Sequence, residues 1–329
     1  MDIAEFQENE IQALIILSEL CDPVETPNNN SYKFYPNTVK EAQTYFRRFT
    51  LDISDVYPSL LEKGYVSKED DAWRLTEEGR LMSREVRRVR PPIWYWYKDF
   101  YMAIETSKVF SEYCERVFGR DMSQHGFCDL AELNFMLDVI KLSRGKRVLD
   151  IGCGNGGIAE YISDSTGADV TGIDYIPEAI EQARWRTVGK GDRLHFMVGN
   201  LERLAFGRWS YDHIIAIDSI FFGKEMEETV GNLKKLLKPG GTMAVYCDEV
   251  LGAALGANGL DYDAYDRSRE LYTHLQLKHR VAQELMGAFE AEGNGFIAGN
   301  LLVESLAGEA PYDPGKWDVK RYLYHVRSS

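Results

Sequence analysis

A glycine-rich stretch preceded by an acid is the part of this sequence best suited to chemistry. Residues 148–157 read Val-Leu-Asp-Ile-Gly-Cys-Gly-Asn-Gly-Gly, with Asp150 two positions before Gly152 and further glycines at Gly154 and Gly156. Glycines let the backbone turn sharply, so a ligand can approach main-chain N–H groups at the start of a helix. The glycines at 152, 154 and 157 also satisfy the G-x-G-x-x-G dinucleotide pattern, so the spacing alone leaves a dinucleotide ligand open.

Two carboxylates narrow the class of ligand. Asp150 lies at the mouth of the glycine loop, where it would repel a pyrophosphate but tolerate a cation. Asp174 ends the next β-like run, where an acid can accept hydrogen bonds from the vicinal hydroxyls of a ribose. Together they predict a nucleoside that carries an amine and a positive charge.

These motifs resemble the class I S-adenosylmethionine-dependent methyltransferases over roughly residues 110–250. The stretch from Asp150 to Gly156 resembles the family's first motif, which implies that this loop holds the methionine end of S-adenosylmethionine. Asp174 resembles the ribose-binding acid, which implies that Tyr175 lies beside the adenine. The resemblance implies no metal.

Further segments resemble the same family in the same order. Asn200 and Leu201 resemble the segment that reads the adenine edge, although many members have Asp in place of Asn200. Ile217 and Asp218 resemble the end of the fourth strand, where backbone and side chain flank the methyl group. Residues 237–241, Leu-Lys-Pro-Gly-Gly, are similar to the turn before strand five.

A narrower resemblance concerns residues 113–126. They are similar to the segment that precedes the first motif in the small-molecule subgroup containing phosphoethanolamine N-methyltransferases, which is related to the cyclopropane synthases. This implies that Ser123 and Gln124 close over the carboxylate of the cofactor. The Tyr–His dyad of the phosphoethanolamine enzymes is missing, because Phe222 stands at the expected His position and Thr106 near the Tyr position.

Methyl transfer from a sulfonium depends mainly on alignment and desolvation, so a strong base is optional. We predict that Asp218 orients an amine and takes up its proton. His125 is the alternative base, although a lone His at this position is equally consistent with packing or with contact to the cofactor. Four aromatic side chains are predicted to wall the acceptor site, where their π faces can hold a cation: Phe221, Phe222, Trp94 and Trp96.

The elements that must position these residues follow a regular pattern. From residue 146 to 329 strands alternate with helices, which predicts an α/β fold with a doubly wound, mostly parallel, Rossmann-like sheet. The β-like runs at 299–307 and 320–327 are expected to close the sheet as an antiparallel pair. Residues 262–292 are expected to form inserted helices.

The first ninety residues predict a small, mainly helical, winged-helix-like domain. Helices are expected at 11–20, 38–46 and 52–64, followed by strands at 65–67 and 73–76 and a helix from residue 77. Acidic residues outnumber basic ones here, apart from a cluster of arginines at 84–90, so DNA binding is disfavoured. We expect dimerisation or a lid role for domain 1–90, and a helical, aromatic-rich active-site cap at 91–145.

Composition excludes several other classes. The 329 residues carry 38 Lys and Arg against 52 Asp and Glu, a net charge of −14 that disfavours nucleic acid and anionic membranes as partners. No apolar run is long enough to span a bilayer, and the N-terminus lacks the basic region of a signal peptide. Five scattered cysteines without a C-x-x-C pair are typical of reduced thiols in a cytoplasmic protein.

The sequence thus predicts a cytoplasmic, homodimeric N-methyltransferase that acts on a small-molecule amine. A small-molecule O-methyltransferase of the natural-product type is the nearest alternative, because such enzymes also carry winged-helix dimerisation domains. An alternative outside the enzymes is a winged-helix regulator with a degenerate cofactor-binding domain. An NAD oxidoreductase is the last alternative.

Overall fold

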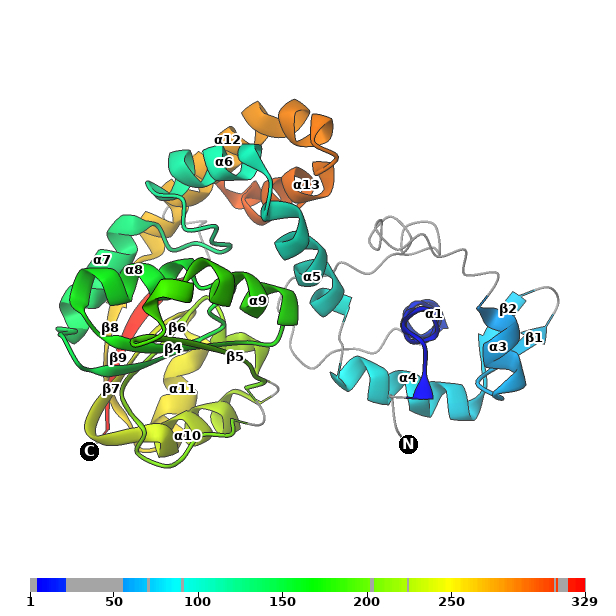
Figure 1. The fold of residues 1–329 in the computed structure, drawn as a ribbon, viewed down its shortest axis with the longest axis horizontal. Helices are drawn as coiled ribbons and strands as arrows, with labels where there is room; N and C mark the ends of the chain where they lie inside the picture. Colours follow the sequence, from blue (N-terminus) through cyan, green and yellow to red (C-terminus); the bar gives the residue numbers. More distant parts are fainter. Residues whose placement is uncertain are drawn as a thin grey trace. The chain divides into compact units, whose positions relative to one another are not determined.

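The computed structural model describes residues 5–21, 56–69, 72–89, 92–201, 204–223, 225–310, 312 and 319–328. The chain divides into two compact units, Met1–Asp99 and Phe100–Ser329. Figure 1 colours the chain from the N-terminus in blue to the C-terminus in red. The division falls inside helix α5 (Pro92–Ile104), and each unit is described by itself.

The first unit combines helices with a two-stranded sheet. Glu10 of the helix Glu8–Cys21 accepts hydrogen bonds from Ser59 Oγ (2.6 Å), in the helix Tyr57–Glu62, and from Lys63 Nζ (2.7 Å), directly after that helix. The predicted strand pair is confirmed as antiparallel. The predicted helix at 38–46 and the start of the one at 52–64 lie outside the described residues, so the winged-helix assignment stays a prediction. The elements are α1 (Glu8–Cys21), α3 (Tyr57–Glu62), β1 (Val66–Glu69), β2 (Ala72–Leu75) and α4 (Glu77–Val89).

The second unit is built on a sheet with the order β5-β4-β3-β6-β7-β9-β8 among the described residues. Neighbouring strands from β5 to β7 are parallel, whereas β9 is antiparallel to both β7 and β8. This confirms the predicted doubly wound, Rossmann-like sheet with antiparallel C-terminal strands. The strands are β3 (Arg147–Ile151), β4 (Asp169–Asp174), β5 (Leu194–Val198), β6 (Tyr211–Ile217), β7 (Leu237–Cys247), β8 (Asp261–Asp266) and β9 (Tyr322–Arg327).

The antiparallel pair differs from the expected one. The run at 299–307 was predicted as a strand, but it lies in helix α13 (Gly295–Glu304) and the short η5 (Leu306–Gly308). The partner of β9 is instead β8, whose residues were assigned to the inserted helices. In α13, Ile297, Ala298 and Leu301 are buried on one helical face, and a short apolar run of this kind fits a helix or a strand equally well.

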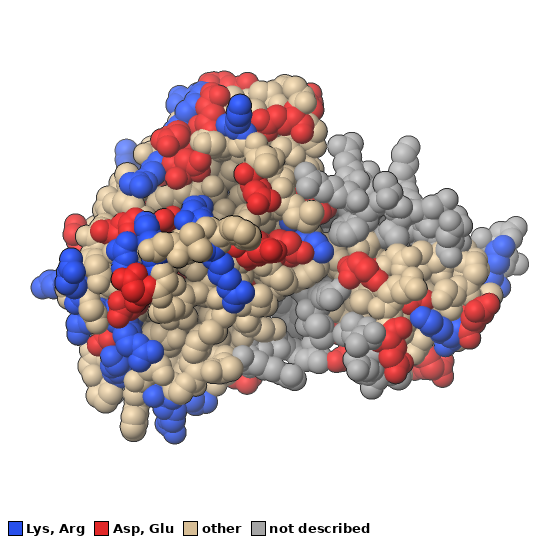
Figure 2. Space-filling view, viewed as in Figure 1, with Lys and Arg blue, Asp and Glu red and all other residues tan. Residues whose placement is uncertain are grey.

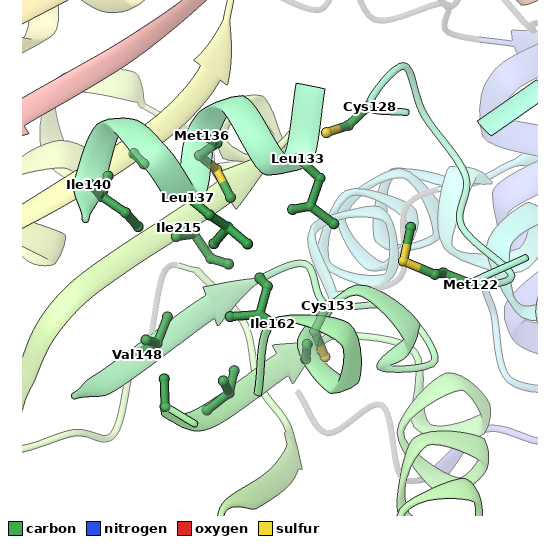
Figure 3. Packing of buried hydrophobic residues seen from close by; sticks show 14 of the residues in the cluster. Met122, Cys128, Leu133, Met136, Leu137, Ile140, Val148, Cys153, Ile162 and Ile215 are labelled. Atoms are coloured by element: carbon green, nitrogen blue, oxygen red, sulfur yellow. The ribbon is translucent and has the colours of Figure 1, made fainter. Parts of the chain in front are cut away.

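Helices cover both faces of the sheet and enclose two hydrophobic clusters. In β3 and β6 the side chains alternate, so that Val148 and Ile215 point into one cluster while Leu149 and Ile214 point into the other. Figure 3 shows the first cluster between the sheet and its covering helices. Helices α7 (Leu130–Ile140), α8 (Gly157–Thr166) and α9 (Pro177–Arg186) cover this face, and α10 (Met226–Leu236) and α11 (Val250–Ala257) cover the other.

A group of helices adjoins the sheet on the side of α7 and α8. Helix α12 (Ser268–Ala291) packs against both α6 (Lys108–Phe118) and α13, and the three lie together at the top of Figure 1. Ser107 accepts a hydrogen bond from Phe110 N (3.0 Å) as the N-cap of α6 and donates one to Glu292 Oε2 (2.5 Å). The inserted helices expected at 262–292 are therefore represented by α12, which packs against α6 of the segment that precedes the sheet.

The charges are distributed without a basic face on the side that Figure 2 shows, where Lys and Arg are interspersed with Asp and Glu. None of the helices in the described part of the chain combines the length and apolar character that a membrane span requires.

Candidate active site

The glycine loop connects the end of β3 to the start of α8. Gly152, Gly154 and Gly156 have φ angles of 70°, 55° and 77°, in the left-handed region that favours glycine. A Cβ at residue 152 would lie 2.5 Å from Ser219 Cβ, and one at residue 154 would lie 2.5 Å from Tyr101 Oη. Both glycines are therefore required by conformation and by space.

The two acids at the strand ends differ in their hydrogen bonding. Asp174 accepts one backbone N–H on each oxygen, from Gly154 (2.9 Å) and from Ile176 (2.9 Å). Asp150 is 3% exposed, and its Oδ2 atom has no hydrogen-bond partner among the described residues. Asp150 therefore carries a buried oxygen whose bonding capacity the described protein does not use.

Burial also changes the proton affinity of these acids. Burial, followed by the charge of Asp174, raises the pKa of Asp150 to about 7. Burial raises the pKa of Asp174 to about 6 despite the backbone hydrogen bonds, which lower it. A cation beside the pair would favour the ionised carboxylates and lower both pKa values. The site thus fits a positively charged nucleoside such as S-adenosylmethionine, and it does not fit a pyrophosphate.

A pocket above the loop brings together many of the predicted residues. Asp150, Gly152 and Gly154 line it together with the segment from Met122 to His125. The complete lining is Tyr101, Met122, Ser123, Gln124, His125, Asp150, Gly152, Cys153, Gly154, Asn155, Gly157, Ile158 and Ile217. The predicted Ser123, Gln124, His125 and Ile217 therefore lie beside the glycine loop.

The segment over the pocket is held by local hydrogen bonds. Ser123 has a positive φ of 51° and donates its N–H to Asp121 Oδ1 (2.8 Å). Gln124 accepts a hydrogen bond from Met122 N (3.0 Å) through its side-chain oxygen. The carbonyl oxygen of Met122 lies 1.9 Å from the position of a Cβ at Gly157, so the segment packs directly on the first residue of α8. Contact of Ser123 and Gln124 with a cofactor carboxylate stays a prediction.

Asp218 follows β6, as expected, but both of its oxygens are engaged. Arg321 Nη2 lies 2.9 Å from each oxygen, and Phe127 donates its N–H to Oδ2 at 2.8 Å. Arg321 is buried, lies 4.1 Å from the centre of the Tyr246 ring and pairs with Glu132 at 3.7 Å. Asp218 therefore pairs with Arg321 and holds the backbone of Phe127, and its role as a general base stays a prediction.

The residues predicted to bind the adenosine part of the cofactor lie at the ends of β4 and β5. Gly199 donates its N–H to the carbonyl oxygen of Asp174 (2.9 Å), which places Asn200 and Leu201 next to the end of β4. Their contact with adenine stays a prediction.

The predicted aromatic wall divides between the two units. The ring of Phe222 is 6.2 Å from that of Tyr175 and 4.8 Å from that of Phe221, so both phenylalanines lie on the side that the resemblance assigns to the adenine. Trp94 and Trp96 are buried residues of the first unit. A role of these four residues in acceptor binding stays a prediction.

Several residues at the pocket were not singled out from the sequence. Tyr101 falls at the end of the aromatic run 94–101, but nothing in the run distinguishes it from its neighbours. Burial, followed by the charge of Asp174, raises the pKa of Tyr101, so it is a neutral phenol. Gly157 has a signal in the sequence, since it is the last glycine of the motif. No group of three His, Cys, Asp or Glu in the described part of the chain is arranged to hold a metal ion.

Comparison with known proteins connects this geometry to a family. Residues 148–241 match the family model described as a methyltransferase domain. A sterol 24-C-methyltransferase of Pneumocystis carinii is 35% identical over 107 residues, which are 32% of this chain and 28% of that protein. The chain therefore spans less than a third of that curated relative.

Two solved structures show the same fold. A phosphoethanolamine N-methyltransferase of Haemonchus contortus, in complex with phosphomonomethylethanolamine and S-adenosylhomocysteine, has a TM-score of 0.56 at 18% identity, over 70% of this chain and 60% of that one. A cyclopropane synthase of Mycobacterium tuberculosis has a TM-score of 0.57 at 12% identity, over 70% of this chain and 98% of that one. The second unit thus has the Rossmann-like methyltransferase fold of these proteins, and its residues 148–241 match the methyltransferase domain model.

Proposed function

We propose that this protein is an S-adenosylmethionine-dependent methyltransferase acting on a small molecule. The observation that carries the proposal is the buried carboxylate of Asp150, whose Oδ2 has no hydrogen-bond partner among the described residues, beside the glycine loop of a segment that matches a methyltransferase domain. A dinucleotide would bring its pyrophosphate to this loop, next to two buried acids. A sulfonium nucleoside would bring positive charge there instead.

The residues divide the binding of the cofactor among them. Asp174 would accept the ribose hydroxyls on the lone pairs that its two backbone hydrogen bonds leave, and Tyr175 and Asn200 would flank the adenine. Asp150 would face the cationic methionine end, with Ser123 and Gln124 above it. When bound, S-adenosylmethionine supplies an activated methyl group. The buried surroundings would exclude water and align the acceptor with that group.

An amine is the acceptor that the sequence predicts, and the solved Haemonchus contortus relative is an N-methyltransferase by its title. A carbon acceptor is the second candidate, because the Pneumocystis carinii relative is a 24-C-methyltransferase by its name. An O-methyltransferase has less support, because the expected His base after strand five is replaced by Tyr-Cys-Asp-Glu at 246–249.

Ligand binding followed by methyl transfer tests the proposal. Calorimetry of the full chain should show binding of S-adenosylmethionine and S-adenosylhomocysteine, and none of NADH at the same concentration. Transfer of radiolabelled methyl groups to panels of amines and of sterols then separates the two acceptor classes. Binding of NADH without S-adenosylmethionine would overturn the proposal.

Homodimerisation through the first unit belongs to the same proposal. Light scattering of the full chain should give the mass of two chains. A monomeric mass would exclude dimerisation and favour the alternative role of the first unit as a lid. Salt-dependent binding of random duplex DNA would instead support the alternative that the protein is a winged-helix regulator.

A further inference from the structure

One peptide group beside the pocket is held from both of its edges. Gly126 and Phe127 directly follow the pocket-lining segment that ends at His125. The carbonyl oxygen of Gly126 accepts a hydrogen bond from Lys278 Nζ of α12 (2.8 Å), and the N–H of Phe127 donates one to Asp218 Oδ2 (2.8 Å). These polar atoms belong to the same trans peptide bond, so they point in opposite directions. Lys278 and Asp218 therefore bind opposite edges of the peptide group between residues 126 and 127.

Both charged side chains that hold this peptide are buried and paired. Lys278 is fully buried, and its Nζ lies 3.2 Å from Glu304 Oε2 of α13. Asp218 is largely buried, and Arg321 Nη2 lies 2.9 Å from each of its oxygens. An apolar pair of similar volume is often as stable as a buried ion pair. The charged pairs have a geometric effect that an apolar pair would lack, because a cation at the carbonyl and an anion at the N–H fix the direction of one peptide dipole.

The same two side chains restrict this peptide in other ways. Lys278 Nζ lies 4.5 Å from the centre of the Phe127 ring, so Lys278 contacts two consecutive residues. Gly126 has a φ of 125°, which side chains with a Cβ rarely adopt, and a Cβ there would lie 3.0 Å from Asp218 Oδ2. Several contacts together thus set the position of this peptide relative to α12 and the end of β6.

The anchored peptide is one end of the segment that covers the pocket, residues 122–127. Residues 122–125 of this segment line the pocket. At its other end, the carbonyl oxygen of Met122 packs on Gly157, the first residue of α8. The segment is therefore fixed at both ends. A binding site that is already ordered loses less conformational entropy when its ligand binds.

We propose that Lys278 and Asp218 are positioning residues, which hold segment 122–127 in the conformation that receives the cofactor. The proposal rests on the proposed methyltransferase function, in which Ser123 and Gln124 of this segment face the methionine end. Without the anchored peptide, the segment would have to be ordered when the cofactor binds, and the affinity would fall. The positioning role of Asp218 involves no proton transfer, so it is independent of the prediction that Asp218 is a base.

Removing the Lys278 anchor tests this role without knowledge of the methyl acceptor. Lys278→Met alone would leave Glu304 buried without its lysine, so Glu304→Gln is compared with the double variant Glu304→Gln/Lys278→Met. Both proteins lack the Glu304 carboxylate, so any effect of its contact with His125 cancels. Calorimetry of the full chain should give a dissociation constant for S-adenosylhomocysteine at least about tenfold higher in the double variant, the factor that one hydrogen bond from a charged group supplies.

Lys234→Met is the control for the loss of a lysine that binds a backbone carbonyl. Lys234 of α10 donates to the carbonyl oxygen of Asn258 (2.7 Å), and neither residue lines the pocket. Because this site is separate from segment 122–127, the dissociation constant of S-adenosylhomocysteine should change by less than about twofold.

Hydrogen exchange measured by mass spectrometry separates a positioning role from a general loss of stability. Without ligand, segment 122–127 should exchange faster in the double variant than in Glu304→Gln, while the glycine loop at 152–157 keeps its protection. Faster exchange throughout the second unit would show that Lys278 only stabilises the fold, and it would overturn the proposal.

Gly126→Ala tests the same peptide while every charged pair is kept, and it decides the question if the double variant does not fold. It should also weaken S-adenosylhomocysteine at least about tenfold, because a Cβ disfavours the φ of 125°. Gly145→Ala is its control, since Gly145 also has a positive φ, of 73°, and a Cβ there would meet no atom within 4 Å.

The outcomes separate the two proposals. If the wild-type protein binds S-adenosylhomocysteine and the folded variants of Lys278 and Gly126 bind it equally well, the positioning role is wrong and the methyltransferase proposal stands. If the wild-type protein binds neither S-adenosylmethionine nor S-adenosylhomocysteine, both proposals fail.

Discussion

Replacing Asp150 by Asn tests whether this carboxylate is kept for a cationic ligand at a cost in stability. In the absence of ligand, burial and the charge of Asp174 raise the pKa of Asp150 from 3.8 to about 7. The folded protein therefore binds this proton more tightly than the unfolded chain does. Consequently the free energy of unfolding falls as the pH rises through the interval between the two pKa values.

The size of the effect follows from that interval. From about pH 5 to about pH 7 the unfolded chain is already ionised at Asp150 while the folded carboxyl still holds its proton, and each pH unit costs about 1.4 kcal/mol. The wild-type protein should therefore lose about 3 kcal/mol that Asp150→Asn does not lose. The difference in stability between the two proteins should widen by that amount in favour of the variant.

Urea unfolding followed by circular dichroism measures this difference at both pH values without ligand. Asp212→Asn is the control of opposite sign. Burial would raise the pKa of Asp212, but a hydrogen bond from Lys238 lowers it to about 2, so ionised Asp212 stabilises the fold and its loss should destabilise it. A stability difference for Asp150→Asn that does not change with pH would refute the buried-charge argument. Undiminished binding of S-adenosylmethionine by the variant would refute its role toward the cation.

Three further perturbations follow from the same geometry. The affinity for S-adenosylmethionine, measured by calorimetry, should rise with pH up to about 7, because Asp150 and Asp174 are ionised only above pKa values of about 7 and about 6; a flat profile would contradict this. Gly152→Ala should weaken the same ligand at least tenfold, since its Cβ would lie 2.5 Å from Ser219 Cβ, and unchanged affinity would remove the loop from the site. Arg321→Met should lower stability by about 3–5 kcal/mol, because it leaves the Asp218 carboxylate buried without its cation. Thermal melts should show partial recovery when Asp218→Asn is added, and no loss in Arg321→Met would show the pair to be dispensable.

The sheet and the cofactor loop were predictable because their signals are local. A strand, a turn and a helix leave period-2 and helical patterns and glycines within a few residues of each other. Asp150, Asp174 and Asp218 each stand at or directly after the end of a strand in the sequence, and β4, β3 and β6 are neighbours in the sheet. Acids that follow parallel strands necessarily meet at one edge of the sheet.

The antiparallel closure was harder to predict. The sequence of β8, Asp-Tyr-Asp-Ala-Tyr-Asp, alternates polar and apolar residues only over its first four positions, and all six residues are exposed and lack the apolar face that identifies a buried strand. The apolar run in α13 fits either structure. Which of the two segments pairs with β9 depends on the packing of the whole edge, so local pattern could not decide it.

The sequence by itself determined the fold class, the glycine loop and the acids that predict a cationic nucleoside, because neighbouring residues carry those features. Only the tertiary structure decided which charged side chains pair with one another. It paired Asp218 with Arg321, which follows 103 positions later, and it brought Glu304 and Lys278 to His125. Such contacts form between segments that are distant in the chain, and burial then sets which charges are compensated and which face the pocket. The sequence named Asp218 and His125 as candidate bases, and which of them takes up a proton stays a prediction.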